Sequence, residues 1–476
     1  MAAVREQVSG PVWGVSAGLG AVLTAGSVGY GYHRDELYYR MLPPAWGYVD
    51  QPPLTPFVAR LTTQVADTVW ALRVPATLAA MAAVVVVALL ARELGADRPR
   101  QTLAAGAYAC ATLPLMLGHL LLTSTLDLFF LPLLILLSLK AIRSPRWWVA
   151  PGLVAGLTTY NRWLVAVVGV AAVLGLAVLG PRRVFTSVWL WAGGLLALVV
   201  ALPNLVYQAT HDWPQIRMGQ ALAEDAGEVR VTVLILLVAG VGPLFPLLWR
   251  GVVTLAREPR TRYLVVVTVA VYAFTFVAGA QPHYVVVALV VWLTAGVITT
   301  SSPRRLWRVA AITGAVSAVL ALPVIPVSVV GATPVTKVSS LMPDQVGWPT
   351  YVGQVARAYR AAVTADPGAP PPVIITANYG EAGAIDRFGP AHGLPRAYSG
   401  HNGLYDVARP SGPARSALLV GDLGPRQLAL FAQCRQVGTL DNGVDVDNEE
   451  QDQPIRLCTG LRRSWELSWP AFAHLD

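Results

Sequence analysis

The residues best suited to chemistry are carboxylates that follow an apolar block. Asp35 and Glu36 are adjacent and come soon after the apolar block 11–30, and Asp50 follows fifteen residues after Asp35. A carboxylate within about 3 Å of a hydroxyl can take its proton while the hydroxyl attacks another atom. Carboxylates also stabilise positive charge that develops in a transition state. Residues 31–71 therefore predict acid–base chemistry, and the plainer alternative is an acidic, solvated loop with a helix cap.

Asp50 lies in a segment whose backbone is restricted by proline. Residues 48–54 read Tyr-Val-Asp-Gln-Pro-Pro-Leu, and proline disfavours helix in the residue before it. We therefore expect Asp50 and Gln51 on an extended segment just before a helix begins. A third carboxylate, Asp127, comes near the start of another apolar block. Its alternative role there is a helix N-cap, and the sequence alone does not bring the three carboxylates together.

Other polar residues lie near the ends of apolar blocks and could bind an anionic group. Arg162 stands in a polar run between two apolar blocks, and Arg217 lies in the polar stretch 207–230. Arginine is suited to such a site because its guanidinium can contact phosphate through two hydrogen bonds. His283 and Tyr284 come just before another apolar block. The alternatives are an interfacial histidine and, for Arg217, a solvated loop charge.

The elements that must position these residues are membrane helices. The 476-residue chain is 55% hydrophobic and 13% charged, whereas soluble domains are about 25% charged. A membrane span needs about 20 apolar residues, and we expect about eleven transmembrane helices in an α-helical polytopic membrane protein. The apolar blocks are 11–30, 72–92, 102–121, 127–142, 147–161, 163–180, 185–206, 231–250, 262–280, 284–301 and 307–330.

The loops between these blocks differ in charge. Of the 23 Lys and Arg residues before position 331, sixteen fall in one alternating set of loops and seven in the other. Basic loops face the cytoplasm. The sequence therefore predicts a multi-pass protein of the plasma (inner) membrane with a cytoplasmic N-terminus. Residues 1–330 form the membrane domain, with outward loops 31–71 and 207–230. The formal charge of +8 belongs to that domain, so no nucleic-acid partner is expected.

Residues 331–476 have a different character and are predicted to form a small extracytoplasmic α/β domain. The runs 373–376 and 417–420 are typical of strands, and 427–431 is typical of a helix. Cys434 and Cys458 both fall in this domain. Since the compartment is oxidising, we expect a disulfide between them.

The acidic segments together resemble a known family. An Asp-Glu pair after the first span, the run Tyr-x-Asp-x-Pro-Pro-Leu, and an Asp that opens the fourth span are similar to GT-C glycosyltransferases. The resemblance is greatest to the protein O-mannosyltransferase and lipid A aminoarabinose transferase branch, which is glycosyltransferase family 39-like. The run Gln-Pro-His-Tyr at 281–284 also resembles a late motif of that branch. The resemblance covers roughly residues 1–300.

This resemblance implies a polyprenyl-phosphate-linked sugar donor and an acceptor hydroxyl on a protein, lipid or glycan. The sugar would be transferred at the outer membrane face with inversion. In that branch the first Asp acts as the base or orients the acceptor, a role that carries over to Asp35 with Glu36 beside it. The acid before Pro-Pro carries over to Asp50, and Asp127 matches the acid that opens the fourth span. Gln51 stands where the aminoarabinose transferases carry a lysine, so the donor-phosphate contact differs there.

Two other classes of protein remain as alternatives. A polytopic transporter or lipid flippase would explain spans broken by Gly and Pro, such as residues 238–246, and a non-catalytic scaffold would explain an outer domain. A transporter should carry charges within its spans, whereas this chain concentrates its acids in outward loops. No cofactor is required by the sequence. A divalent metal at Asp50 stays an alternative, since no dedicated ligand spacing accompanies it.

Overall fold

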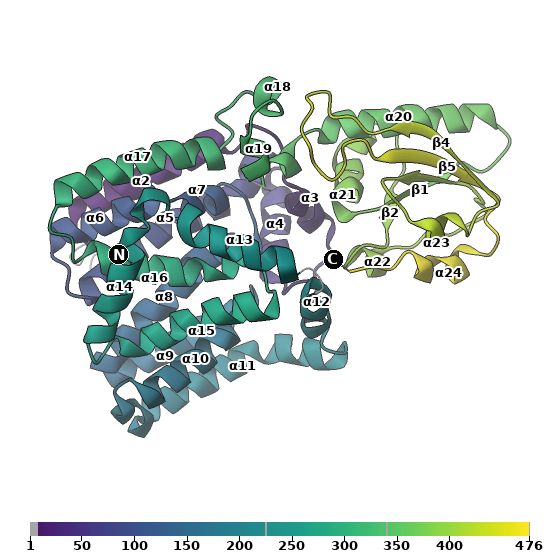
Figure 1. Ribbon diagram of the computed structural model, residues 1–476. Coiled ribbons are helices and arrows are strands. Elements are labelled where there is room, and N and C mark those ends of the chain that lie inside the picture. The colour runs from purple at the N-terminus through teal and green to yellow at the C-terminus, as the bar shows by residue number, and fades with distance from the viewer. Residues whose placement is uncertain (1–7, 224–225, 339–340, 476) are drawn as a thin grey trace. The chain divides into compact units, whose positions relative to one another are not determined.

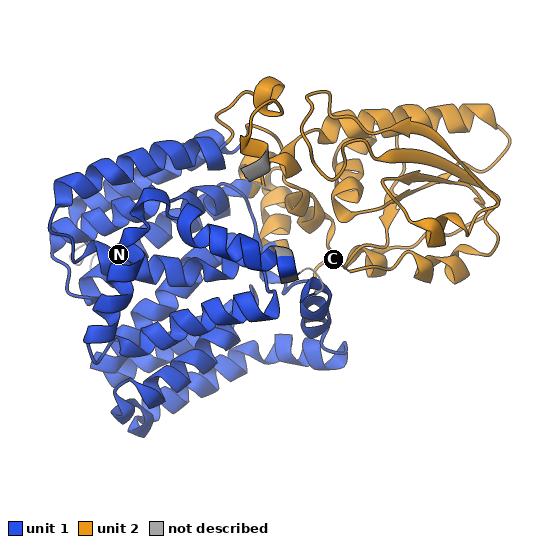
Figure 2. Cartoon of the chain, in the orientation of Figure 1, with its two compact units in different colours: residues 1–27, 46–55, 73–322 blue, residues 28–45, 56–72, 323–476 orange. Residues whose placement is uncertain are grey.

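The computed structural model describes residues 8–223, 226–338 and 341–475. The chain divides into two compact units, shown in Figure 2: unit 1 comprises residues 1–27, 46–55 and 73–322, and unit 2 comprises 28–45, 56–72 and 323–476. Two segments from the first part of the chain thus belong to the unit that contains the sheet. The assignment of residues 1–330 to the membrane stays a prediction. Residues 1–7, which the topology prediction places in the cytoplasm, lie outside the described residues.

Unit 1 is built from helices (Figure 1), and each of the eleven predicted apolar blocks contains helix. Its helices are α2 (Gly10–Gly26), α5 (Val69–Glu93), α6 (Arg98–Ala109), α7 (Thr112–Gly118), α8 (Thr123–Arg143), α9 (Val149–Thr158), α10 (Leu164–Val178), α11 (Val188–Thr210), α12 (Pro214–Leu222), α13 (Ala226–Ala239), α14 (Pro246–Arg257), α15 (Arg262–Ala278), α16 (Val286–Val297) and α17 (Pro303–Ala321).

The predicted count of eleven membrane crossings is not confirmed. Among the described residues, only α5, α8 and α11 are single helices long and apolar enough to cross a membrane. The pair Val229–Ala239 and Gly242–Arg257 passes the same test together but bends by 78°. Several other blocks form shorter helices; block 102–121, for example, is divided between α6 and α7 at residues 110–111.

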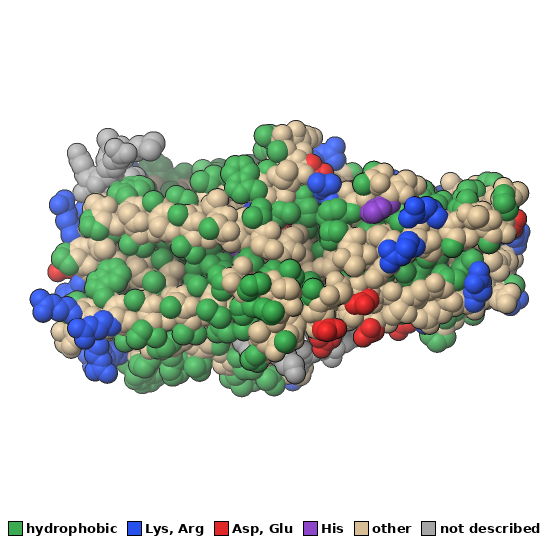
Figure 3. Space-filling model, turned by 90° about the horizontal axis from the view of Figure 1, so that it is seen from above, with side chains coloured by type: hydrophobic (Ala, Val, Ile, Leu, Met, Phe, Trp, Pro, Cys, Tyr) green, Lys and Arg blue, Asp and Glu red, His purple; other side chains and the backbone are tan. Residues whose placement is uncertain are grey.

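The surface of unit 1 is suited to lipid. Only 17% of the most apolar 18-residue stretch of α11 is buried inside the protein. Large exposed apolar surfaces are rare on soluble monomers. Figure 3 shows one face of the molecule, much of it covered by hydrophobic side chains. These features describe a multi-pass membrane protein. The large exposed side chains of α11 are Val188, Trp189, Trp191, Leu195, Leu198, Val199, Leu202 and Val206.

Glycines allow two helix pairs of unit 1 to pack backbone against backbone. A Cβ atom added to Gly193 of α11 would lie 2.2 Å from the carbonyl oxygen of Trp148, at the start of α9. A Cβ on Gly296 of α16 would lie 2.0 Å from the carbonyl oxygen of Leu247 in α14. Small residues at helix contacts are typical of membrane bundles. The contacts fix α9 and α16, which adjoin the polar segments described below.

Unit 2 contains one mixed sheet with the strand order β2-β1-β3-β5-β4. Strands β2, β1 and β3 pair in parallel, and β5 pairs antiparallel with both β3 and β4. The predicted strands 373–376 and 417–420 coincide with β1 and β3. The strands are β1 (Val373–Thr376), β2 (Ala397–Ser399), β3 (Ala417–Val420), β4 (Gln433–Thr439) and β5 (Pro454–Thr459).

The helices of unit 2 begin in the first part of the chain and continue through the sheet region (Figure 1). They are α3 (Arg34–Met41), α4 (Leu54–Val65), which begins in unit 1, α18 (Val327–Val330), α19 (Val335–Val338), α20 (Trp348–Ala365), α21 (Tyr379–Phe388), α22 (Leu404–Val407), α23 (Pro425–Leu428) and α24 (Trp465–Ser468).

Alternating strand residues supply the core on one face of the sheet. Ile375, Ala417 and Leu419 pack with Trp465 and Phe472, all of them buried. This alternation is the expected result of side chains that point to opposite faces in turn. The predicted small α/β domain is therefore present as a five-stranded sheet with helices.

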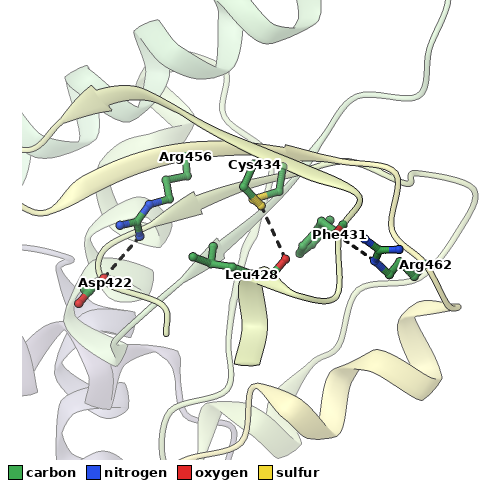
Figure 4. The surroundings of a disulfide bond; sticks show 7 residues. Asp422, Leu428, Phe431, Cys434, Arg456 and Arg462 are labelled. Atoms are coloured by element: carbon green, nitrogen blue, oxygen red, sulfur yellow. Dashed lines mark hydrogen bonds and ion pairs between the residues drawn. A yellow bond between two sulfur atoms is a disulfide. The ribbon is translucent and has the colours of Figure 1, made fainter. Parts of the chain in front are cut away.

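Cys434 and Cys458 form a disulfide between the neighbouring strands β4 and β5. This is the pair expected from the sequence. Figure 4 shows its surroundings, where the Arg462 side chain donates to the carbonyl of Phe431. The predicted helix 427–431 is wrong in its bounds, since α23 ends at Leu428. The chain turns there because the next residues bond to the region after β5, as when Ala432 donates to the carbonyl of Thr459.

Candidate active site

A buried polar cluster lies among the helices of unit 1. The carboxylate of Asp127 forms an ion pair with Arg162, with 2.9 Å between Oδ2 and Nε. Arg162 also contacts the imidazole of His283 and donates to the hydroxyl of Thr123. Its guanidinium lies 4.8 Å from the centre of the Tyr284 ring. The structure thus brings together four residues that the sequence analysis named separately.

Each member of this cluster comes from the end of a helix. Asp127 lies in the first turns of α8, and Arg162 stands in the turn between α9 and α10, where its amide donates to the carbonyl of Thr158. His283 and Tyr284 lie in the short 3-10 helix Pro282–Val285 that leads into α16. Proline at the start of that turn restricts the backbone to helix-compatible angles. The cluster therefore ties three helical regions together at one level.

Asn161 connects this cluster to the segment that carries Asp50. Its amide donates to Asp127 Oδ1 over 2.8 Å, and its side-chain oxygen accepts from Thr55 over 3.1 Å. The backbone amide of Leu54 donates to the carbonyl of Tyr160 over 2.8 Å. The residues that follow Gln51-Pro-Pro are thus held against the turn that carries Arg162.

The charges in the cluster compensate one another. Asp127 and Arg162 are 5% and 7% exposed, and a buried guanidinium needs a partner of opposite charge. Arginine can only donate hydrogen bonds, so the Nε2 atom of His283 that faces Arg162 must accept. The proton of a neutral His283 ring is then on Nδ1. In this arrangement Arg162 carries a charge that Asp127 already neutralises, and it is a structural tie as well as a candidate phosphate contact.

Asp50 and Gln51 lie on a segment without regular secondary structure, as expected from the prolines. A backbone bond of 2.9 Å from Tyr48 to Gln51 closes a turn around Asp50. Asp50 is half-buried and Gln51 is buried. The segment is tied to α11 by Asn204, whose side chain donates to the carbonyl of Trp46.

The stretch 207–230, predicted as a loop, is largely helical. Helix α11 continues to Thr210, α12 follows, and α13 begins at Ala226. Residues 224–225 lie outside the described residues. Arg217 of α12 is exposed and donates to the backbone carbonyl of His211 over 3.1 Å, as its solvated alternative predicts.

A second polar site surrounds helix α3 of unit 2. His33 is the N-cap: its Nδ1 atom accepts from the amide of Asp35 over 3.1 Å. In return Glu36 Oε2 accepts from the amide of His33 over 2.9 Å. This reciprocal capping box satisfies backbone donors that a helix start leaves open. Glu36 is fully buried, and its carboxylate caps the start of α3.

Asp35 differs from its neighbour Glu36 in accessibility. It is half-buried, and its Oδ1 atom accepts a hydrogen bond of 2.9 Å from the hydroxyl of Tyr379, the first residue of α21. Beside it Arg34 forms an ion pair with Glu449, and its guanidinium lies 4.9 Å from the centre of the Tyr379 ring. Asp35 is thus a carboxylate on a helix start, held by a phenol and next to a cation.

Acids nearby, the half-buried Asp344 and the buried Glu450, are biased toward their neutral forms. Burial raises the pKa of Asp344 to about 8, against the opposing charge of Arg34, and the carboxylates of Glu450, Glu449 and Asp35 raise it further. Asp344 Oδ2 lies 3.7 Å from His33 Nε2. Burial raises the pKa of Glu450 as well. A neutral Asp344 leaves less negative charge around Asp35 at neutral pH than the sequence suggests.

The described residues contain no group of three or more His, Cys, Asp or Glu side chains that could hold a metal ion. A divalent metal at Asp50 stays the alternative that the sequence left open.

Comparisons with known proteins show what the chain is similar to. Residues 50–207 match the family described as "Dolichyl-phosphate-mannose-protein mannosyltransferase". The chain superposes on ArnT from Cupriavidus metallidurans bound to undecaprenyl phosphate with a TM-score of 0.61 and 14% identity, covering 93% of this chain and 97% of that one. For the apo state of the same protein the TM-score is 0.58 at 14% identity, covering 92% and 95%. The chain therefore shares the fold of these ArnT structures, a GT-C fold. The comparison with curated proteins finds no match.

Two residues of the candidate site in this GT-C fold were missed by the sequence analysis. Asn161 bonds to Asp127, and it directly precedes Arg162, so its position was a usable signal. Tyr379 bonds to Asp35 across 344 positions of sequence. No local pattern signals such a partner, because the contact exists only once α21 packs against α3.

Proposed function

We propose that the chain is a membrane glycosyltransferase that moves a sugar from a polyprenyl-phosphate donor to an acceptor hydroxyl at the outer membrane face, with inversion. The observation that carries this proposal is the Asp35 carboxylate: in a chain with a GT-C fold, it is half-buried and held at the start of α3 by the Tyr379 hydroxyl.

Asp35 is the proposed base. An inverting transfer occurs in one displacement, in which the acceptor oxygen attacks the anomeric carbon and loses its proton. The hydrogen bond from Tyr379 engages Oδ1, so the proton would go to Oδ2. Glu36 is less suited to this role, because its carboxylate caps the helix and is fully buried.

The residues of unit 1 are proposed to bind the donor. The leaving group is a polyprenyl phosphate, whose negative charge needs hydrogen-bond donors or cations. The ring of His283, the hydroxyl of Tyr284 and the guanidinium of Arg162 could supply them. Asp50 and Gln51 are proposed to line the same donor site, since Leu54 and Thr55 are bonded to the turn that precedes Arg162.

The proteins to which the chain is similar support this choice of donor. The matched family is named for mannose transfer from dolichyl phosphate to protein, and the similar ArnT structure holds undecaprenyl phosphate. Both are polyprenyl phosphates.

A transfer assay tests the proposal. Purified protein in lipid nanodiscs would receive undecaprenyl phosphate carrying tritiated mannose, arabinose or galactose, with a Ser/Thr-rich peptide, a glycolipid or a cell-wall oligosaccharide as acceptor. We expect labelled acceptor and free undecaprenyl phosphate from at least one pair, and the same products from Asp35→Asn at a rate lower by about 10²- to 10⁴-fold. Movement of the lipid across the bilayer without sugar transfer would instead favour the flippase alternative, which the 78° bend between α13 and α14 would then explain.

A further inference from the structure

The start of helix α21 is fixed from several directions. Asn378 Oδ1 accepts from the amide of Glu381 over 2.9 Å, and Glu381 Oε2 accepts in return from the amides of Ala377 and Asn378. The side chain of Asn378 also donates to Glu450 over 3.0 Å. This second capping box leaves the first residue of α21, Tyr379, with a defined backbone position.

The ring of Tyr379 is held as firmly as its backbone. It stacks on Tyr38 of α3 with 4.7 Å between ring centres, and the His401 ring lies 4.5 Å away. The guanidinium of Arg34 lies 4.9 Å from its centre. A phenol side chain has only two rotatable angles to fix before its hydroxyl is aimed. With the ring packed between these neighbours, the hydroxyl is directed at Asp35.

Two glycines let α21 approach α3 closely enough for this contact. A Cβ atom added to Gly383 would lie 2.7 Å from Leu37 Cβ and 2.8 Å from the Leu37 backbone. A Cβ on Gly380 would lie 3.1 Å from Arg34 Cβ. Because the contact is at backbone level, a larger residue at 383 would push the helices apart and withdraw Tyr379 from Asp35.

We infer that Tyr379 is a positioning residue for the reaction, and that the domain which carries it is part of the catalytic apparatus. Its hydroxyl donates to the Asp35 carboxylate and fixes the orientation in which Asp35 receives the acceptor proton. The region 323–476 then has a role beyond display or acceptor binding: it sets the geometry of the base. This inference rests on the proposed function of Asp35.

The hydrogen bond is of the kind that can carry such a role. A hydrogen bond to a charged group is stronger than a neutral one, and the distance of 2.9 Å between the phenol and Asp35 Oδ1 is normal for such a bond. A carboxylate that can rotate loses part of the advantage of a fixed base, because catalysis by positioned groups depends on small distances.

The direct test is Tyr379→Phe, which removes the hydroxyl and keeps the packed ring. We expect kcat to fall roughly 10- to 100-fold, the factor that corresponds to losing one hydrogen bond to a charged group. KM for the undecaprenyl-phosphate sugar used in the transfer assay should change less than threefold. In the Asp35→Asn background the same change should have no further effect, since the residue acts through Asp35.

Tyr351→Phe is the matched control. The Tyr351 hydroxyl bonds to Asn448 and Asn442 in the same unit and has no bond to Asp35, so its loss should lower the melting temperature and leave kcat within twofold. If both phenylalanine variants lower the melting temperature and kcat alike, Tyr379 is merely structural and the inference fails. Full activity of Tyr379→Phe beside an inactive Asp35→Asn also refutes it, with the proposed function intact. Turnover of Asp35→Asn within a few-fold of the parent refutes the role of Asp35 as the base and this inference with it, and no transfer by the parent protein with any donor and acceptor pair refutes the proposed function itself.

If the Tyr379→Phe protein does not fold, a second substitution tests the same role. Incorporation of 3,5-difluorotyrosine at position 379 keeps the ring and hydroxyl but changes the strength of the donor. A changed kcat at an unchanged melting temperature supports the positioning role, and an unchanged kcat contradicts it.

Discussion

Asp127 of unit 1 and Asp35 of unit 2 both lie on early turns of helices, but they differ in burial and in hydrogen-bond partners. Asp127 of unit 1 is 5% exposed, and both of its oxygens are engaged, Oδ1 by Asn161 and Oδ2 by Arg162. Asp35 of unit 2 is half-buried, and a neutral phenol, that of Tyr379, bonds to one of its oxygens.

This difference suits Asp127 to a structural role and Asp35 to a chemical one. A fully paired, buried ion is stable because its partner compensates it, and taking up a proton would break that pairing. A carboxylate oriented by a neutral hydroxyl keeps its own charge and can accept a proton from an approaching group. By this comparison Asp127 fixes the turn that carries Arg162, and Asp35 is the better candidate for the base.

The same substitution at both sites tests most directly whether Asp35 and Asp127 have different roles. Asp35→Asn should lower turnover by about 10²- to 10⁴-fold, since an amide cannot accept the proton. Asp127→Asn should lower turnover of the folded protein less than tenfold, with its main effect on the melting temperature and on KM for the donor. Steady-state transfer rates, normalised to the folded fraction, would decide. Equal loss of turnover at both sites with normal stability would abolish the distinction.

Removing Arg162, the cation that pairs with Asp127, tests whether this ion pair stabilises unit 1. Arg162→Ala leaves Asp127 buried without its counter-charge, which typically costs about 3–5 kcal/mol. We expect a large fall in the melting temperature of the detergent-solubilised protein. Arg217→Ala removes an exposed arginine and should change stability by less than about 0.5 kcal/mol.

The double variant Asp127→Asn with Arg162→Gln checks the cause. It removes both charges and should recover much of the stability that Arg162→Ala loses, because no uncompensated charge remains. An Arg162→Ala protein as stable as the parent would mean that the ion pair does not hold the cluster.

The acids around Asp35 should give unit 2 a characteristic pH dependence. The pKa of Asp344 is raised from its ordinary value of 3.8 to about 8, so between these values the folded state binds more protons than the unfolded state. Stability therefore falls as pH rises from about 4 to about 8. Burial raises the pKa of Glu381 and Glu450 in the same direction. Melting temperatures measured from pH 5.5 to 8.5 should decrease.

Asp344→Asn should flatten this decrease, because asparagine carries no charge at any of these pH values. The stabilisation at pH 8.5 is expected to be about 1–3 kcal/mol. Asp366→Asn, at an exposed position after α20, is the matched control and should leave the pH profile unchanged. A parent protein whose stability rises across this range would contradict the burial of an uncharged Asp344.

The sequence predicted local elements better than pairings. Strands 373–376 and 417–420 coincide with β1 and β3, because short apolar runs between turn residues have few alternatives. The count of eleven spans was not confirmed, because an apolar block does not reveal where it divides into shorter helices, as block 102–121 does at residues 110–111. The helix expected at 427–431 ends early, because bonds to the end of β5 redirect the chain.

The candidate site shows the same limit. Residue type and position sufficed to single out Asp127, Arg162 and His283, but not to show that Asp127 would neutralise Arg162. That pairing depends on which helix ends meet. The partner of Asp35 is 344 positions away, and a lone tyrosine after a strand carries no signal for such a contact.

The smallest expected effect concerns Glu36, the neighbour of Asp35. Glutamine can replace glutamate in a capping box because its side-chain oxygen still accepts from the N-cap amide. Glu36→Gln should therefore keep turnover within a few-fold of the parent and change stability little. Glu36→Ala removes the acceptor for the His33 amide and should cost about 0.5–2 kcal/mol, as the loss of other helix caps does.

Glu381 offers the matched comparison for this last prediction, because it holds the equivalent place in the capping box of α21. Glu381→Gln should likewise keep its cap, so both glutamine variants should melt close to the parent temperature and transfer sugar at similar rates. A Glu36→Gln protein that melts normally yet loses turnover a hundredfold would show that the buried carboxylate has a chemical task. The role of base would then move from Asp35 to Glu36, and the contrast between a capping and a reacting carboxylate on α3 would be reversed.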